Sequence, residues 1–508
     1  MSQYKIVKCV VSLLIILILS SCSKAVKEEE RGKVLYETYC TSCHIPVSIS
    51  DLPKKAWEDG VIPEVGARLG VLYDGYNPYD GLSFPEIELI YKAGIFPLKP
   101  VIEREDWQIL KKYILDKAPD SIMSQGNNYT SNELTSFTAN TISLDENPGS
   151  LITFLDLDEK RNRILTGDIS GNLYSYKLNE GNSLIGSFGS GVTAYTENDS
   201  ISYTTAVGVL TPSELSSGKI IMTRDNEQFD VSGVLHRPVN NLVHDLDKDG
   251  IDELVISEFG HHTGKLTLLH NFKNGVFEKK VLLNQPGAIR VLAKDMDNDG
   301  KDDLIALMAQ GDESITILYQ KDNFRFDAEK VIRFSPIYGL SWFELIDFNN
   351  DGFQDIVTVN GDNADKTYVH KPYHGLRIHI NDGKNNFEEK YFFSINGSTR
   401  LVAEDFDMDG DFDFGIISTF PDYKNHPKRS FVYLENKNYK TYEFEPKTIE
   451  DSKLGRWLLM DSGDVDQDGD KDIILSSFTY SFTPVPDENK ELWNNKNADI
   501  LILENKLK

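Results

Sequence analysis

Two cysteines and a histidine near the start of the chain have the spacing of a haem attachment site. Cys40 and Cys43 are separated by two residues, and His44 directly follows the second thiol. At this C-x-x-C-H spacing both thiols can reach the vinyl groups of one porphyrin, and the histidine then lies beneath the iron. We therefore predict covalent haem c on Cys40 and Cys43, with His44 as the proximal ligand.

A redox-active dithiol and half of a zinc site are the competing interpretations of these thiols. A zinc site needs further Cys or His ligands, and residues 45–122 contain neither. The same stretch contains no Met, so no methionine sulfur within it can be the second axial ligand of the iron. Met123 is the nearest candidate; an open or water-bound iron, a histidine farther along the chain and a nearby lysine are the alternatives.

Five acidic loops form a second group of residues that could do chemistry. Each loop places oxygen donors at positions 1, 3, 5 and 9 and a glycine at position 6. Ca²⁺ takes six to eight oxygen ligands, which matches this density of carboxylates. The candidate Ca²⁺ ligands are Asp245, Asp247, Asp249 and Glu253; Asp295, Asp297, Asp299 and Asp303; Asp347, Asn349, Asp351 and Asp355; Asp405, Asp407, Asp409 and Asp413; and Asp464, Asp466, Asp468 and Asp472.

An EF-hand and an acidic turn that binds nothing are the competing interpretations of these loops. An EF-hand loop ends in Glu at position 12, whereas position 12 is Ile256 in the first loop and Ala306 in the second. Clustered carboxylates repel one another and need a counter-ion, which favours a bound cation over an unoccupied turn.

The spacing of the loops predicts the elements that carry them. The loops begin 50 to 59 residues apart, and each is followed by a short β-rich run and then by a second strand-like segment. Two further copies of the second segment precede the first loop, and a degenerate loop without the glycine begins at Asp156. Seven such units predict a seven-bladed β-propeller over residues 148–508. The repeats resemble the FG-GAP/VCBS repeats of integrin-like propellers, which implies this fold and Ca²⁺ binding.

The residues around the thiols predict a separate small all-α domain, residues 31–120. One helix leads into Cys40, and a later helix carries an apolar stripe at i, i+3 and i+7: Trp107, Leu110 and Ile114. This arrangement resembles a class I cytochrome c. The resemblance implies that the first and last helices cross where a small residue admits aromatic side chains; Gly32 would admit Trp107 and Tyr113.

The N-terminus resembles that of a bacterial lipoprotein. Lys5 and Lys8 precede a mostly apolar run that is too short to span a bilayer. Leu19-Ser20-Ser21-Cys22 resembles a lipobox, which implies a signal peptide over residues 1–21 and a lipid on Cys22; an ordinary signal peptide is the alternative. We expect a lipidated tether over residues 22–30 and a Ser/Thr/Asn-rich linker over residues 121–147.

The formal net charge of −27 argues against nucleic acid as a partner. The sequence contains no recognisable hydrolase or transferase constellation. We predict a multidomain, lipid-anchored cytochrome of the bacterial envelope, periplasmic or at the cell surface, that transfers single electrons to an unidentified redox or envelope partner. Whether it is an enzyme stays open. The alternatives are an adhesion propeller with accessory haem, and a peroxidase or gas sensor with an open iron.

Histidines gather in one set of predicted propeller loops. These loops connect the strand after each acidic loop to the next strand, and such loops emerge on the same face in every blade. Five histidines fall in them: His261, His262, His370, His374 and His426. We therefore predict that this face is a docking surface, with unrelated solvated loops as the alternative.

Overall fold

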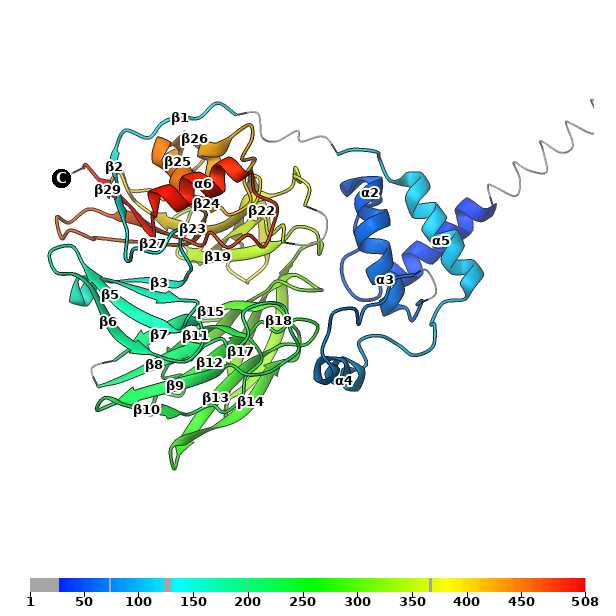
Figure 1. The fold of residues 1–508 in the computed structure, drawn as a ribbon, viewed down its shortest axis with the longest axis horizontal. Helices are drawn as coiled ribbons and strands as arrows, with labels where there is room; N and C mark the ends of the chain where they lie inside the picture. Colours follow the sequence, from blue (N-terminus) through cyan, green and yellow to red (C-terminus); the bar gives the residue numbers. More distant parts are fainter. Residues whose placement is uncertain (1–26, 73–74, 123–128, 199, 365–367, 508) are drawn as a thin grey trace, which may run out of the picture. The chain divides into compact units, whose positions relative to one another are not determined.

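The computed structural model describes residues 27–72, 75–122, 129–198, 200–364 and 368–507. The chain divides into two compact units, Met1–Ile122 and Met123–Lys508. The described part of the first unit is helical, and the second unit consists almost entirely of β-strands (Figure 1). In the described residues no helix is long and apolar enough to cross a membrane.

The helical unit begins with a helix over residues 27–40, which ends at the first thiol. It continues with η1 (Ile49–Asp51), α2 (Lys54–Ala56), a π-turn η2 (Trp57–Val61), α3 (Ile62–Arg68), α4 (Phe84–Ala93) and α5 (Arg104–Lys117). As the apolar spacing predicts, α5 buries Trp107, Leu110 and Ile114.

The first and last helices of this unit pack closely at Gly32. A Cβ at Gly32 would lie 2.5 Å from the Cβ of Tyr113, so only glycine fits between the helix 27–40 and α5. The prediction that Gly32 admits Tyr113 is therefore confirmed. Trp107 lies elsewhere along α5 and packs over Gly66 of α3, where an added Cβ would lie 3.0 Å from its ring.

The second unit is a seven-bladed propeller in which each blade is a four-stranded antiparallel sheet, extended by one short strand in blade 6. Blades 1 to 4 comprise β3 (Ile152–Asp158), β4 (Arg163–Asp168), β5 (Asn172–Lys177) and β6 (Gly181–Ser187); β7 (Val192–Glu197), β8 (Ile201–Ala206), β9 (Lys219–Arg224) and β10 (Glu227–Asp230); β11 (Pro238–His244), β12 (Glu253–Glu258), β13 (Lys265–Lys273) and β14 (Val276–Leu283); and β15 (Ala288–Lys294), β16 (Asp303–Met308), β17 (Ser314–Lys321) and β18 (Arg325–Arg333).

Blades 5 to 7 follow the same order of strands, with one exception at the end of the chain. They comprise β19 (Leu340–Ile346), β20 (Asp355–Asn360), β21 (Gly375–Asn381) and β22 (Phe387–Ser394); β23 (Ser398–Glu404), β24 (Asp413–Ser418), β25 (Phe431–Asn438) and β26 (Glu443–Thr448); and β27 (Trp457–Gly463), β28 (Asp472–Ser477) and β29 (Ile500–Asn505). Short helices η3 (Glu159–Arg161), η4 (Pro427–Ser430), η5 (Glu450–Leu454) and α6 (Asp487–Lys496) lie in the connections.

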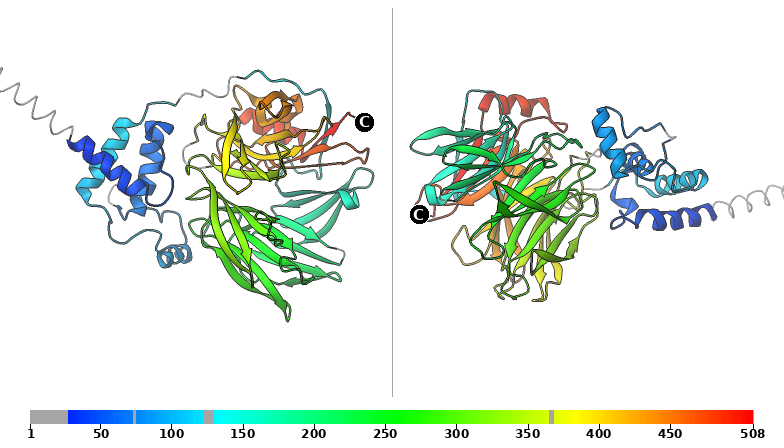
Figure 2. Two further views of the ribbon diagram at one scale, coloured as in Figure 1. Left: turned by 180° about the vertical axis from the view of Figure 1, so that it is seen from behind. Right: turned by 90° about the horizontal axis from the view of Figure 1, so that it is seen from below.

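The first strands of the blades form the inner ring of the propeller. Each contacts the first strand of the next blade, and β27 contacts β3, which closes the ring (Figures 1 and 2). The blades are held together by apolar layers between neighbouring sheets. Between blades 3 and 4, for example, Leu246, Leu266 and Leu268 pack against Val291 and Leu304.

The last blade is completed from the other end of the propeller sequence. The C-terminal strand β29 belongs to this blade, and its outer neighbour is β2 (Phe137–Ile142). A second short strand, β1 (Asn132–Glu133), pairs with β26. The segment predicted as a linker, residues 121–147, therefore contributes strands to the propeller. The segment is mostly polar, but two of its side chains, Leu134 and Phe137, are buried and pack in the core.

Candidate functional sites

The two thiols lie where the first helix of the helical unit ends. Cys40 is the last residue of the helix 27–40, and Cys43 and His44 follow in a bend. Both thiols are free, Cys40 half-buried and Cys43 exposed. Burial, with the neighbouring Cys43 adding to it, raises the pKa of the Cys40 thiol to about 11, so this sulfur is protonated at neutral pH.

The histidine of the motif is oriented by the backbone. Nδ1 of His44 lies 2.8 Å from the carbonyl oxygen of Ile45. With Nδ1 donating its proton to this oxygen, Nε2 keeps a lone pair that can bind a metal. The Tyr36 hydroxyl donates to the carbonyl of Val47, which fastens the segment after the motif to the helix before it.

Exposed apolar side chains are abundant in the helical unit. Leu98 is 71% exposed and Val101 is 56% exposed. The Val101 carbonyl oxygen accepts a hydrogen bond of 3.3 Å from the hydroxyl of Tyr39, the residue before Cys40. A flat apolar group attached at the thiols would cover such a surface. The predicted distal ligand Met123, the predicted lipidation site Cys22 and the predicted signal peptide lie outside the described residues.

The five acidic loops share one backbone conformation. Each connects the first and second strands of blades 3 to 7. The glycine at position 6 has φ between 87° and 98° in every loop, as its place in the pattern predicts. In every loop its N–H also donates to the carboxylate at position 1, at 2.9 to 3.1 Å. The residue at position 4 has φ between 57° and 66° as well, although it is Lys, Met or Gln in three of the loops.

The carboxylate at position 9 has a structural role that the sequence pattern does not reveal. In the second loop, Asp303 accepts the N–H of Met296 at 2.9 Å and the N–H of Gln320 at 2.8 Å. The same pair of bonds recurs at Asp355 and Asp472. Position 9 thus connects its own loop to the third strand of the blade, and lone pairs remain on each oxygen for a cation.

In four loops the structure brings at least three predicted ligands together. In each group one oxygen from every residue lies within 4.8 Å of the others, as a shared cation requires. Buried Oδ1 atoms of Asp295 and Asp464 have no hydrogen-bond partner among the described residues. The groups are Asp245, Asp247 and Glu253; Asp295, Asp297 and Asp299; Asp405, Asp407 and Asp409; and Asp464, Asp466 and Asp472.

Without a cation these carboxylates are held in an unfavourable environment. Burial raises the pKa of Glu253 and of Asp413 to about 7, and neighbouring carboxylates add to the shift. In the third loop, where Asn349 replaces a carboxylate, the Asn349 amide donates to Asp351 at 2.8 Å. That loop therefore has less repulsion to balance than the other four.

The degenerate loop of blade 1 balances its charge with arginines. Asp158 accepts hydrogen bonds from the Arg163 Nε at 2.9 Å and from the Arg161 Nη1 at 3.1 Å. Although burial opposes it, these bonds hold the pKa of Asp158 below its ordinary value. The sequence indicates this difference, because basic residues such as Arg161 stand in the degenerate loop, which lacks the glycine and carboxylates of the other loops.

The histidines predicted to share one face do not form a single cluster among the described residues. The rings of His261 and His262 lie 4.2 Å apart, and the His262 N–H donates to the buried Glu214. His370 lies 3.8 Å from Asp422. His374 is buried, and this burial holds its pKa well below its ordinary value. At least one of the five is therefore a core residue.

Comparisons with known proteins agree with the repeat pattern. The model of the FG-GAP-like repeat matches residues 245–306 and 295–358. No curated protein matches the chain. Among solved structures, the N-terminal domain of Nup159 has a TM-score of 0.40 at 10% identity, covering 74% of this chain and 97% of that one.

Two further solved structures have similar scores. Sqt1 of Saccharomyces cerevisiae has a TM-score of 0.41 at 11% identity, covering 69% of this chain and 83% of that one. The Cps50 (Swd1) β-propeller domain of Myceliophteria thermophila has a TM-score of 0.42 at 11% identity, covering 66% and 96%. The chain carries FG-GAP-like repeats on a seven-bladed β-propeller.

Proposed function

We propose that this protein is a lipid-anchored c-type cytochrome that transfers single electrons, with a calcium-stabilised propeller as its docking module. The observation that carries the proposal is the C-x-x-C-H segment at the end of the helix 27–40, in a compact helical unit. Its thiols are free, its histidine is oriented through Nδ1, and the helical unit exposes apolar side chains such as Leu98 and Val101. These features fit a covalently attached haem.

Three residues would hold the haem. Cys40 and Cys43 would form the thioether bonds, and His44 would offer Nε2 to the iron while the Ile45 carbonyl fixes its ring. Haem bound there would supply a reversible one-electron couple. A haem covering the exposed apolar side chains of the unit would be partly shielded from water. Met123 is the proposed sixth ligand.

The haem proposal is tested by expressing the chain with a haem-attachment system and recording mass and optical spectra. We expect one covalent haem in the wild type and in Ser42→Ala, and loss of the two-bond product in Cys43→Ser. Failure of the wild type to bind haem would overturn the proposal.

The distal ligand decides between electron transfer and chemistry at an open iron. Low-spin spectra that turn high-spin in Met123→Ala would support Met123 and electron transfer. High-spin spectra in the wild type, with carbon monoxide binding, would instead support the peroxidase or gas-sensor alternative.

We propose Ca²⁺ as the ligand of the five acidic loops, where it would stabilise the blades. The support is the clustering of carboxylate oxygens in four loops and the common turn geometry in all five. Metal analysis after gel filtration tests this, with four to five Ca²⁺ expected per chain. No retained or titratable Ca²⁺ would overturn it.

Membrane anchoring would use a lipid on Cys22, and the docking partner would be a redox or envelope protein. Radiolabelled palmitate tests the anchor: we expect incorporation in the wild type and none in Cys22→Ala. Incorporation unaffected by that change would contradict the lipid assignment.

A further inference from the structure

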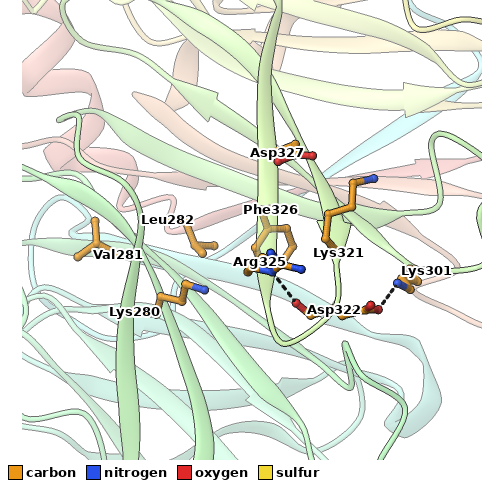
Figure 3. Close-up of a pocket in the computed structure, with 9 residues that line it drawn as sticks. All are labelled: Lys280, Val281, Leu282, Lys301, Lys321, Asp322, Arg325, Phe326 and Asp327. Carbon is orange, nitrogen blue, oxygen red and sulfur yellow. Dashed lines mark hydrogen bonds and ion pairs between the residues drawn. The ribbon is translucent and has the colours of Figure 1, made fainter.

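A cavity of the propeller lies between the outer strands of blades 3 and 4, beside the second acidic loop. It has a volume of about 550 Å³. Figure 3 shows that β14 contributes Lys280, Val281 and Leu282. The hairpin of β17 and β18 contributes the residues facing them, and the second acidic loop contributes Lys301. Two blades thus build one concave site, which neither could form alone.

The cavity is cationic in a strongly acidic protein. Its polar lining consists of four basic side chains and two carboxylates, Asp322 and Asp327, a net charge of +2, whereas the whole chain carries −27. The basic side chains are Lys280, Lys301, Lys321 and Arg325. Positive charge gathered in one hollow on such a chain favours an anionic ligand.

Only some of the N–H groups of these basic side chains are hydrogen-bonded within the protein. Lys280 donates to the carbonyl of Phe324 at 2.7 Å, and Lys301 donates to Asp322 at 2.8 Å. Arg325 donates from Nε to the Asp322 carbonyl at 3.3 Å. Among the described residues, no acceptor is recorded for the two terminal nitrogens of Arg325. This edge of the guanidinium can therefore bind an oxyanion through two hydrogen bonds.

The remaining lining restricts the kind of anion. Leu282 and Phe326 are half-buried and offer an apolar surface beside the cations. An aromatic or aliphatic ring would pack on them while its charged group reached Arg325. A polyanion would be repelled by the rest of the chain in proportion to its charge. A small ligand with one charged group fits best.

We propose that this cavity binds a small organic anion in which a phosphate or carboxylate group is attached to an apolar ring. Arg325 and Lys280 would bind the oxyanion, and Phe326 and Leu282 would pack against the ring. The cavity has room for such a molecule, because ligand sites typically have volumes of about 300–1,000 Å³.

The second acidic loop couples this cavity to calcium. Lys321 Nζ lies 3.7 Å from Asp297, a predicted Ca²⁺ ligand, and Lys301 occupies position 7 of the same loop. Ca²⁺ on Asp297 would neutralise the partner of Lys321 and free that cation for the anion. Anion binding is therefore stronger with Ca²⁺ than without it, a step that rests on the proposed calcium sites.

Calorimetric titration of the full chain with phenyl phosphate and with benzoate tests the proposal and distinguishes the two anionic groups. We expect saturable binding of at least one probe, binding of inorganic phosphate at least tenfold weaker, and at least a tenfold loss in Arg325→Gln. Lys384→Gln, in the turn between β21 and β22, is the control and should bind as the wild type does. No saturable binding, or equal binding by Arg325→Gln, would overturn the proposal.

The calcium step has its own readout. With chelator present, we expect weaker probe binding by the wild type and no change in Asp297→Asn, where Lys321 is already free. The melting temperature, measured in parallel, reports calcium binding separately. If the melting temperature does not depend on Ca²⁺ but the probe still binds, the proposed calcium sites are wrong and the proposed anion site stands. If the melting temperature depends on Ca²⁺ but the probe does not bind, the proposed anion site is wrong and the calcium sites stand.

Discussion

The two faces of the propeller differ in the groups that lie next to their carboxylates. On the face formed by the turns between first and second strands, four loops gather three carboxylates around one point. On the opposite face, formed by the turns between second and third strands, a buried carboxylate is instead satisfied by hydrogen-bond donors of the chain itself. There Glu214 accepts hydrogen bonds from the His262 N–H at 2.6 Å and the Thr263 hydroxyl at 2.7 Å.

Blade 1 shows what the acidic face looks like when the chain supplies its own cations. Its turn keeps Asp158 and pairs it with Arg161 and Arg163. The carboxylate of this turn is thus balanced by guanidinium groups of the chain itself. If the acidic loops bind Ca²⁺ as proposed, their contribution to stability depends on the ions in solution, whereas that of the blade 1 turn does not.

Removing calcium should produce the largest effect, because it acts on all the acidic loops together. Each proposed site would contribute about 2.7 kcal/mol when free Ca²⁺ exceeds its Kd a hundredfold. We expect chelation to lower the melting temperature of the propeller, and added Ca²⁺ to restore it, in scanning calorimetry. An unchanged melting temperature would mean that the acidic loops, like the turn of blade 1, do not need Ca²⁺ for stability.

Changing one carboxylate in each kind of turn should separate the two mechanisms. Asp158→Asn breaks partly buried hydrogen bonds to arginines, so it should cost about 1–3 kcal/mol with or without Ca²⁺. Asp297→Asn should cost stability only when Ca²⁺ is present. Urea unfolding with Ca²⁺ and with chelator measures both, and a calcium-dependent loss in Asp158→Asn would contradict the comparison.

The turn glycine should matter through its backbone alone. Gly250 has φ of 88°, and an added Cβ would meet no atom within 4 Å. Gly250→Ala should therefore cost about 1–2 kcal/mol, the price of a left-handed conformation for an L-residue. Urea unfolding with Ca²⁺ present checks this value. A change close to zero would show that the turn can adopt another conformation.

The opposite face should respond to acid through His374. Its side chain is 1% exposed, and burial, with Lys371 and Arg377 adding to it, holds the pKa well below the ordinary value of 6.5. Protons then bind the unfolded chain preferentially, so stability falls as pH drops below that value. Between pH 6.5 and 5.5 this one group should account for about 1 kcal/mol. The measurement is the difference between wild type and His374→Asn in excess Ca²⁺; equal slopes would contradict it.

The smallest effect should come from position 4 of the acidic loops. Met408 has φ of 57°, whereas the second and third loops place Asn298 and Asn350 at the same position. Asparagine tolerates this conformation better, so Met408→Asn should stabilise by up to about 1 kcal/mol. Urea midpoints in Ca²⁺ would detect it, and destabilisation would show that the Met408 side chain contributes packing.

The predictions that the structure confirms came from patterns between residues close together in the sequence. The glycine at position 6 and its left-handed φ follow from a turn of fixed length, and the stripe on α5 follows from helical period. Pairings between distant segments were not predictable in this way. Phe137 and Leu134 lie in a polar segment without a period, and only their partners in blades 6 and 7, far along the sequence, make them core residues.

The sequence by itself determined the repeat, the number of blades, the conformation of the acidic turns and the placement of two thiols and a histidine at a helix end. These depend on neighbours a few residues apart. The tertiary structure alone decided that β2 closes the last blade, that Asp303 connects its loop to Gln320, that His374 is buried, and that β14 and β18 build a cationic cavity. These depend on contacts between blades or strands, which become visible only when the chain closes into a ring.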